Sequence, residues 1–384
     1  MHSLKTVLLC AIALLLAARA RADEPTYGPP DDPTRPGHGE LLQPGMGAAP
    51  LLVPEAPLQW PSSETYASPR DPRKPAETTQ IDPACAANVP PQFETTVESL
   101  LWRLENTDSR PMILNPLLGT EVRTGDLDLG IHAGPRVNCA FLADQGIPDI
   151  QGIEFGYFGV YDWNHRRLET APGATFLRLP DRFGDLGATV DFATADEMRV
   201  WYDVQVNSVE LNLLSGRLQA PFSWIFGGRF IRLDEHFNLD SFTAGRMSFY
   251  QVDARNDLYG IQGGARWNVR RGYWTFSPVV KIGIYNNNAK QTTLVTDNDR
   301  TVVLRSFSTE LPVASSVLDA GISVGYQVSD FWSVRVGYNV FWMYNVARAP
   351  DQLDFSDNDM SGSRLFLRDN VVAHGLNIGL ERRW

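Results

Sequence analysis

Hydrophobic and polar residues alternate with a period of two from Phe93 to the end of the chain. The clearest run is Trp332–Tyr344, in which every second residue is aromatic or valine. Leu318–Val328 and Trp274–Ile284 follow the same pattern. Strict alternation is typical of β-strands with one apolar face, and no segment here shows the 3.6-residue period of a long amphipathic helix. The pattern predicts an all-β body over residues 93–384.

Ten strands are expected, near residues 94–104, 125–141, 150–162, 198–213, 221–233, 248–269, 272–287, 316–328, 331–346 and 370–384. Short gaps at 142–149, 214–220, 270–271 and 329–330 alternate with long gaps at 105–124, 163–197, 234–247, 288–315 and 347–369. Barrels of the bacterial outer membrane combine short periplasmic turns with long outer loops in this way. The sequence therefore predicts an antiparallel transmembrane β-barrel of about ten strands (10–12) with both ends in the periplasm.

Aromatic residues bracket the apolar faces of several expected strands. The pairings are Trp332 with Trp342 and Tyr344, Trp274 with Tyr285, and Phe222 and Trp224 with Phe230. Aromatic girdles at the two membrane interfaces produce such spacing. A soluble β-sandwich is the alternative fold, because one face of its strands is also polar.

The last strand ends on an aromatic residue, Trp384, and this resembles outer-membrane barrels of Gram-negative bacteria. The proline-rich leader and the segments Val97–Trp102, Gly152–Phe158 and Gly260–Trp267 are similar to β-barrel porin family 7. The resemblance covers roughly residues 93–384. It implies an outer-membrane location, contact with outer-membrane lipid, and assembly by the barrel assembly machinery through the strand that ends at Trp384.

The N-terminal part has a different composition. Residues 1–22 contain Lys5, the apolar run Val7–Ala18 and an A-x-A site at Ala20–Ala22, which predicts a cleaved signal peptide and export. Residues 23–92 hold 16 of the 26 prolines. Because proline removes backbone donors and little apolar surface remains there, a disordered periplasmic leader is expected. Its role is either contact with a periplasmic or cell-wall partner or that of a simple spacer.

The net charge limits the classes of partner, and the cysteine content limits the possible disulfides. Without its signal peptide the chain has 31 Lys and Arg residues against 45 Asp and Glu residues. An acidic chain lacks the basic surface that nucleic acids require, so no nucleic-acid partner is expected. Cys85 and Cys139 remain after export, and the sequence leaves open whether they form a disulfide.

If the apolar faces meet lipid, the opposite faces line a lumen. The expected lumen-lining residues are Glu98, Asp128, Glu154, Asp203, Asp319 and Glu381 together with Arg136, Arg229, Arg266, Lys281 and Arg335. The first functional hypothesis is porin-like passive passage of small polar solutes through a narrow charged lumen. The alternative is a non-conducting structural or binding barrel, in which these charges pair and the outer loops or leader contact another envelope component. Barrels of about eight strands are filled by side chains and those of about 16 are open, so ten strands do not decide between them.

Catalytic and metal-binding patterns are weak. His132 shares a face with Asp128, but no G-x-S-x-G nucleophile motif accompanies the pair. Asp357–Gly362 begins like a calcium loop, yet Arg368 stands where a bidentate glutamate is needed. We therefore expect no enzyme activity, cofactor or metal site, with an outer-membrane hydrolase as a third alternative. The gap 163–197 is expected either to fold inward as a constriction or to project outward.

Overall fold

The computed structural model describes residues 92–384 apart from 106–107, 143–149, 181–189, 216–220, 298, 357–359 and 368. The expected signal peptide, Cys85 and all but the last residue of the expected leader lie outside the described residues. Within the described part, no helix is both long and apolar enough to cross a membrane.

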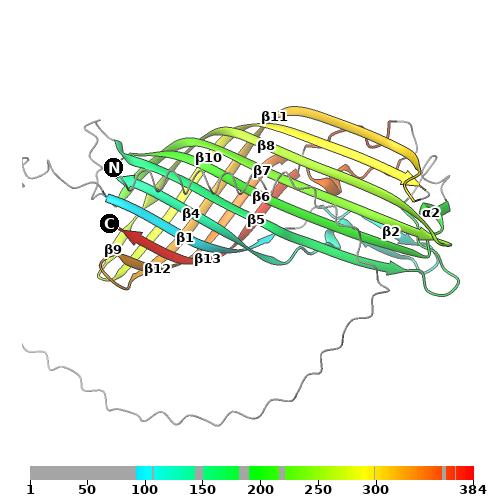
Figure 1. The fold of residues 1–384 in the computed structure, drawn as a ribbon, viewed down its shortest axis with the longest axis horizontal. Helices are drawn as coiled ribbons and strands as arrows, with labels where there is room; N and C mark the ends of the chain where they lie inside the picture. Colours follow the sequence, from blue (N-terminus) through cyan, green and yellow to red (C-terminus); the bar gives the residue numbers. More distant parts are fainter. Residues whose placement is uncertain are drawn as a thin grey trace, which may run out of the picture. The chain divides into compact units, whose positions relative to one another are not determined.

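Ten strands form a closed antiparallel barrel, in which each strand pairs with its neighbour along the chain (Figure 1). They are β1 (Gln92–Leu104), β4 (Ile131–Leu142), β5 (Ile150–Thr170), β6 (Glu197–Ser215), β7 (Phe222–Thr243), β8 (Arg246–Trp267), β10 (Trp274–Asp297), β11 (Val302–Gln327), β12 (Trp332–Val346) and β13 (Asp369–Arg383). The ring closes where β1 pairs with β13, from Glu94 opposite Arg383 to Leu104 opposite Ala373. Closure pairs backbone groups that lipid cannot hydrogen-bond. The predicted fold class is confirmed.

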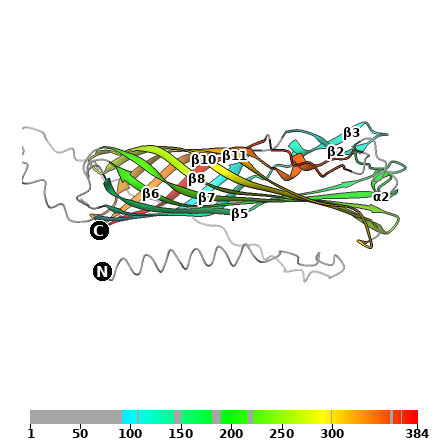
Figure 2. The ribbon, with the colours of Figure 1, turned by 90° about the horizontal axis from the view of Figure 1, so that it is seen from above.

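The shorter elements were not expected from the sequence. They are the hairpin of β2 (Pro111–Asn115) and β3 (Thr120–Arg123), the 3-10 turns η2 (Thr124–Asp126) and η3 (Ala349–Gln352), the one-turn helix α2 (Val190–Ala193) and β9 (Val269–Arg271). We call the end of the barrel that holds the C-terminus the proximal end. Figure 2 shows β2, β3 and α2 at the opposite, distal end. Leu114 of β2 forms a bridge with Arg178, which joins the hairpin to the segment after β5.

The strands differ in length, and this corrects the expected loops. β11 has 26 residues whereas β1 has 13, and Figure 1 shows β5 to β8, β10 and β11 continuing to the distal end. The predicted loops 234–247 and 288–315 are wrong, because most of their residues extend β7, β8, β10 and β11. Only Ala244 and Gly245, both with positive φ, separate β7 from β8. The loop expected at 163–197 shortens to 171–196.

An inversion of the two strand faces explains the error. The proximal part of β7 points apolar residues outward, among them Phe226, which is 54% exposed. Beyond Phe230, the outward positions become Arg232, Asp234 and His236, while the inward positions as far as Leu239 are buried and, apart from Glu235, apolar. A strand that leaves lipid for water needs this exchange of faces. The strands expected at 221–233, 272–287 and 316–328 therefore stop near the point where the outward residues become polar, whereas those expected at 198–213 and 248–269 already include the distal parts of β6 and β8.

The same change occurs on the neighbouring strand. On β8 the outward position changes from Tyr259 to Asp257, and Phe230 and Tyr259 lie with ring centres 4.8 Å apart. Directly distal to these rings, Arg232 pairs with Asp257 at 2.7 Å, and Arg255 pairs with Asp234 at 2.6 Å. The two rings therefore mark the membrane interface on the distal side, and the strand segments beyond them lie outside the lipid.

Candidate functional site

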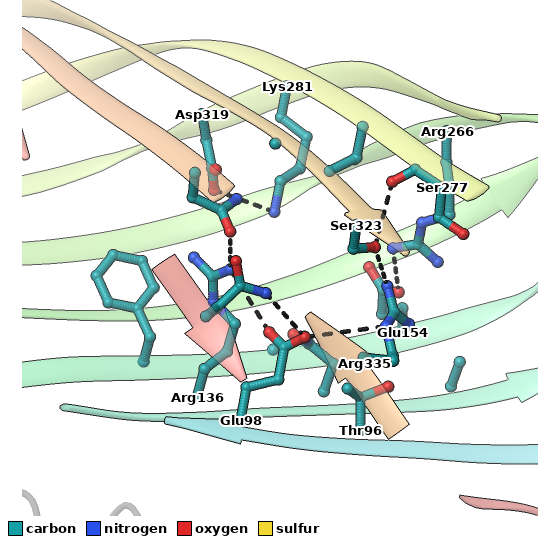
Figure 3. Close-up of a pocket in the computed structure, with 18 of the residues that line it drawn as sticks. Thr96, Glu98, Arg136, Glu154, Arg266, Ser277, Lys281, Asp319, Ser323 and Arg335 are labelled. Atoms are coloured by element: carbon teal, nitrogen blue, oxygen red, sulfur yellow. Dashed lines mark hydrogen bonds and ion pairs between the residues drawn. The ribbon is translucent and has the colours of Figure 1, made fainter. Parts of the chain in front are cut away.

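A network of buried ion pairs fills the proximal half of the barrel interior (Figure 3). Arg229 on β7 places Nη1 3.0 Å from Asp319 Oδ2 on β11 and 3.6 Å from Glu210 Oε2 on β6. Lys281 on β10 places Nζ 2.7 Å from Glu210 Oε1 and 3.3 Å from Asp319 Oδ2. No side chain of this group is more than 10% exposed. Two acids and two bases thus neutralise one another inside the barrel.

A second group lies on the side of β1 and β13. Arg335 on β12 places Nη1 2.5 Å from Glu381 Oε2, and its Nε is 3.9 Å from Glu98 Oε1. Glu98 Oε2 is also 3.8 Å from Arg136 Nη1. Arg383 lies 2.7 Å from Glu381 and 3.5 Å from Glu94. These pairs extend the network to the proximal mouth.

One further ion pair crosses the interior between strands that are not neighbours. Arg266 on β8 places Nη2 2.6 Å from Glu154 Oε2 on β5. Each buried ion costs several kcal/mol to desolvate, so it needs a close partner and additional hydrogen bonds. Gln262 supplies one such bond, donating from Nε2 to Glu210 Oε2 at 2.7 Å. Nearly every charge that faces inward is compensated in this way.

Small residues make room for the network. A Cβ added to Gly321 would lie 2.2 Å from Nδ2 of Asn339. Asn339 accepts a hydrogen bond from Arg136 at 3.0 Å, so this close approach positions a polar partner of the network. The cavity left between the charged side chains has a volume of about 100 Å³. A space of that size holds only a few water molecules.

Three aromatic rings form a layer on the distal side of the network. They are Trp102 on β1, Phe158 on β5 and Phe341 on β12, and all are at most 4% exposed. Their ring centres lie 5.2 Å apart for Trp102 and Phe158, 5.2 Å for Phe158 and Phe341, and 6.1 Å for Trp102 and Phe341. We call these residues the aromatic layer. It consists of strand residues, so it belongs to the barrel wall and not to a loop.

An apolar core continues from the aromatic layer toward the distal end. It includes strand residues such as Val204 and Leu233, hairpin residues such as Ile113, and Ala347 and Ala349 beside η3. A buried polar triad anchors this last segment: Arg348 Nε lies 3.1 Å from Glu235 Oε1, and Arg348 Nη2 lies 3.0 Å from the Tyr202 hydroxyl. Burial raises the pKa of Tyr202 well above its usual range, which keeps the hydroxyl protonated as a donor to Glu235.

The interior network brings together nine of the eleven residues that the sequence analysis placed in the lumen. They are Glu98, Arg136, Glu154, Arg229, Arg266, Lys281, Asp319, Arg335 and Glu381.

Asp128 and Asp203 lie elsewhere and were misplaced. Asp128 precedes β4, which begins at Ile131 and not at 125, and it pairs with Arg103 at 3.2 Å with half of its side chain exposed. Asp203 points to the outside of β6 beyond the lipid, opposite His236 on β7. Burial raises the pKa of Asp203, and the neighbouring charge of His236 lowers it.

Three network residues were missed, namely Glu94, Glu210 and Arg383. The signal for Glu210 was present, because exposed Leu211 and Leu213 mark the lipid face and leave Glu210 on the opposite one. Tyr285 was assigned to the wrong face of its strand, because it was expected in an aromatic girdle. It is 4% exposed and faces inward with Lys281.

The structure describes only some of the residues in the predicted calcium-like loop and the predicted cysteine pair. Residues 357–359 and 368 of the calcium-like loop lie outside the described residues. In the described part of the chain, no group of three or more His, Cys, Asp or Glu side chains could hold a metal ion. Cys139 lies 3.7 Å from Thr95 Oγ1, and its pairing with Cys85 stays open.

A closed antiparallel barrel with an apolar outer belt and a polar interior defines a transmembrane β-barrel of the bacterial outer-membrane type. A family model described as "Putative beta barrel porin-7 (BBP7)" matches residues 192–384, just over half of the chain. The chain belongs to this family and is an outer-membrane protein. No curated protein matches it.

Several solved structures match the chain at low similarity. The outer-membrane protease OmpT of Escherichia coli is 10% identical, with a TM-score of 0.35 and coverage of 78% of this chain and 100% of that one. The toluene transporter TodX of P. putida is 10% identical, with a TM-score of 0.31 and coverage of 79% and 92%. The translocator domain of the autotransporter NalP of Neisseria meningitidis is 10% identical, with a TM-score of 0.33 and coverage of 78% and 90%. Similarity at this level carries no argument about activity.

Proposed function

We propose that the protein is a non-conducting outer-membrane barrel whose distal half serves as a rigid binding platform outside the membrane. The aromatic layer is the observation that carries this proposal. Its rings contact one another across β1, β5 and β12 and border the paired charges. Because the aromatic layer and the ion-pair network are both built from residues of the barrel wall, movement of a loop does not open a path through the interior.

The distal half supports the second part of the proposal. Six strands continue beyond the lipid, and the β2–β3 hairpin and the η3 segment pack on them to form one apolar core. Ion pairs such as Arg232–Asp257 and Arg255–Asp234 lie on its outer wall. A packed core under a polar surface is suited to present a fixed shape to another envelope component or to an extracellular partner.

The location outside the cell can be tested by labelling. Gly245→Cys at the β7–β8 turn should react with a membrane-impermeant maleimide on intact bacteria, in a Cys85→Ser/Cys139→Ser background. Arg271→Cys at the proximal end is the matched control and should react only after the outer membrane is permeabilised. The reverse pattern would contradict the proposed orientation.

Porin-like passage is the second candidate, and one observation favours it. The 100 Å³ cavity is lined by charged and amide side chains on the proximal side of the aromatic layer. Liposome swelling with small sugars and amino acids separates the candidates. A non-conducting barrel leaves the swelling rate at that of empty liposomes, whereas a pore raises it in inverse order of solute size.

Export and assembly belong to the same proposal. A cleaved signal peptide would deliver the chain, and the barrel assembly machinery would read the strand that ends at Trp384. Phe93 and Trp384 exchange backbone hydrogen bonds of 3.1 and 3.0 Å at the closing seam, which supports a role for this last residue in closure. The leader would remain in the periplasm, available for contact with another envelope component. No catalytic role is proposed.

A further inference from the structure

Two carboxyl groups meet in the apolar part of the distal half. Asp351 of η3 is 4% exposed, and neither of its carboxylate oxygens accepts a hydrogen bond. The side chain of Asp369, at the start of β13, lies within hydrogen-bonding reach of it, and Oδ2 of Asp369 is also buried without a donor. Buried acceptors without donors are costly. A shared proton is the smallest change that turns this contact into a hydrogen bond.

The charges around the pair favour a single proton. Arg110, from the segment before β2, places Nη2 3.4 Å from Asp351 Oδ1 and donates from Nη1 to the Asp351 carbonyl at 3.0 Å. Arg348, on the other side, is already engaged by Glu235. Asp351, Asp369 and Arg110 therefore carry one net negative charge when both acids are ionised, and one proton neutralises them. Two carboxylates that share a site cannot both ionise at low cost.

We infer that Asp351 and Asp369 form a proton-dependent clasp that holds the η3 segment to β13 and to the segment before β2. The contact joins three stretches that are distant in sequence: Arg110, Asp351 and the first residue of β13. When the proton leaves, repulsion between the carboxylates loosens η3 from the wall. The clasp is a regulatory device of the distal half and is independent of whether the interior conducts.

The pH range follows from the environment of Asp351. Burial, followed by the hydrogen bond and the charge of Asp369, raises the pKa of Asp351 to about 8, from 3.8 for a free side chain. At a pH between these two pKa values, the closed segment therefore keeps a proton that the open segment releases. Linkage then predicts that the opening constant rises roughly tenfold per pH unit up to about pH 8 and is constant above it.

Hydrogen exchange of the full-length protein in detergent micelles tests the clasp. Protection factors for the amides of residues 348, 349 and 351–353, corrected for the intrinsic pH dependence of exchange, should fall roughly tenfold per pH unit between pH 6 and pH 8. Asp351→Asn, which keeps the shape and removes the ionisation, should make them independent of pH. Asp257→Asn on the outer wall is the control and should retain the slope. Protection that does not vary with pH in the parent protein would overturn the inference.

A bound calcium ion would be another way to neutralise the two carboxylates. The same hydrogen-exchange assay tests this alternative. At pH 8.5, protection should be equal in calcium chloride and in EDTA. Protection restored by calcium would replace the proton with a metal ion and overturn the clasp. Asp369→Asn provides a second variant if Asp351→Asn fails to fold, and a slope unchanged in that variant would also contradict the inference.

Discussion

Arg229 and Phe341 join the two layers that fill the barrel: the guanidinium carbon of Arg229 lies 5.0 Å from the centre of the Phe341 ring. The same guanidinium donates to Asp319 at 3.0 Å. One side chain thus contacts both the ion-pair network and the aromatic layer. A cation over a desolvated ring contributes about 2 kcal/mol, so the two layers stabilise each other.

Asp319 is the first test of the network. Asp319→Asn leaves Arg229 and Lys281 with only Glu210 as a carboxylate partner among the pairs described, so the free energy of unfolding should fall by about 3–5 kcal/mol. Urea unfolding in micelles, followed by tryptophan fluorescence, measures the change. Asp257→Asn removes an equivalent carboxylate from the outer wall and should cost about 1 kcal/mol or less. Equal losses in both variants would mean that the interior charges are hydrated.

The aromatic layer makes a separate prediction. Phe341→Ala removes a fully buried ring and should destabilise the barrel by about 3–5 kcal/mol. Its neighbour Trp342 points outward and is 42% exposed at the protein surface. Trp342→Ala removes a larger side chain, yet it leaves no internal cavity and should cost less. Thermal unfolding in micelles of one detergent gives the comparison, and a larger loss for Trp342→Ala would contradict the account.

A charge exchange tests whether Arg335 and Glu381 are a pair or separate lining residues. Arg335→Glu brings a third carboxylate next to Glu98 and Glu381, and should destabilise the barrel strongly. Adding Glu381→Arg restores one opposite pair at the same place and should recover at least part of the loss. A double-mutant cycle measures the coupling directly. Additive effects of the two substitutions would show that the side chains do not interact.

His236 and Asp253 give the outer wall its own pH dependence. The hydrogen bond to Asp253 raises the pKa of His236. A histidine with a raised pKa contributes stability that is complete below its unfolded pKa of about 6.5 and is lost as the pH rises through the folded value. The melting temperature of the parent protein should therefore exceed that of Asp253→Asn at pH 6, and the difference should shrink by pH 8. A difference that grows with pH would contradict the assignment.

Much of this architecture could be predicted from the alternation alone. The lipid face of Trp332–Tyr344 predicts β12 almost to the residue, and the apolar parity of β10 puts Lys281 inside. The distal extensions of β7, β10 and β11 could not be found in that way, because outward faces turn polar there, as on β7 beyond Phe230. The partner of each inward-facing charged residue could not be predicted from the sequence either. Arg229 and Asp319 meet across non-neighbouring strands, and only the closure and register of the barrel bring them together.

The same limit explains why the sequence left the pore undecided. A charged residue on an inward face lines water or meets a partner according to what stands opposite, and that depends on barrel width and stagger. Trp102, Phe158 and Phe341 lie on three different strands in ordinary alternating patterns. Nothing in any one strand indicates that their rings meet at 5.2–6.1 Å in the interior.

Single-channel recording of the refolded full-length protein in a planar lipid bilayer tests the central claim most directly. Insertion is verified independently by resistance of the barrel to protease in the same lipid. The account predicts inserted protein and no discrete conductance steps at 1 M salt, because the aromatic layer and the paired charges fill the interior. Reproducible steps from the parent protein would contradict it and establish porin-like passage instead.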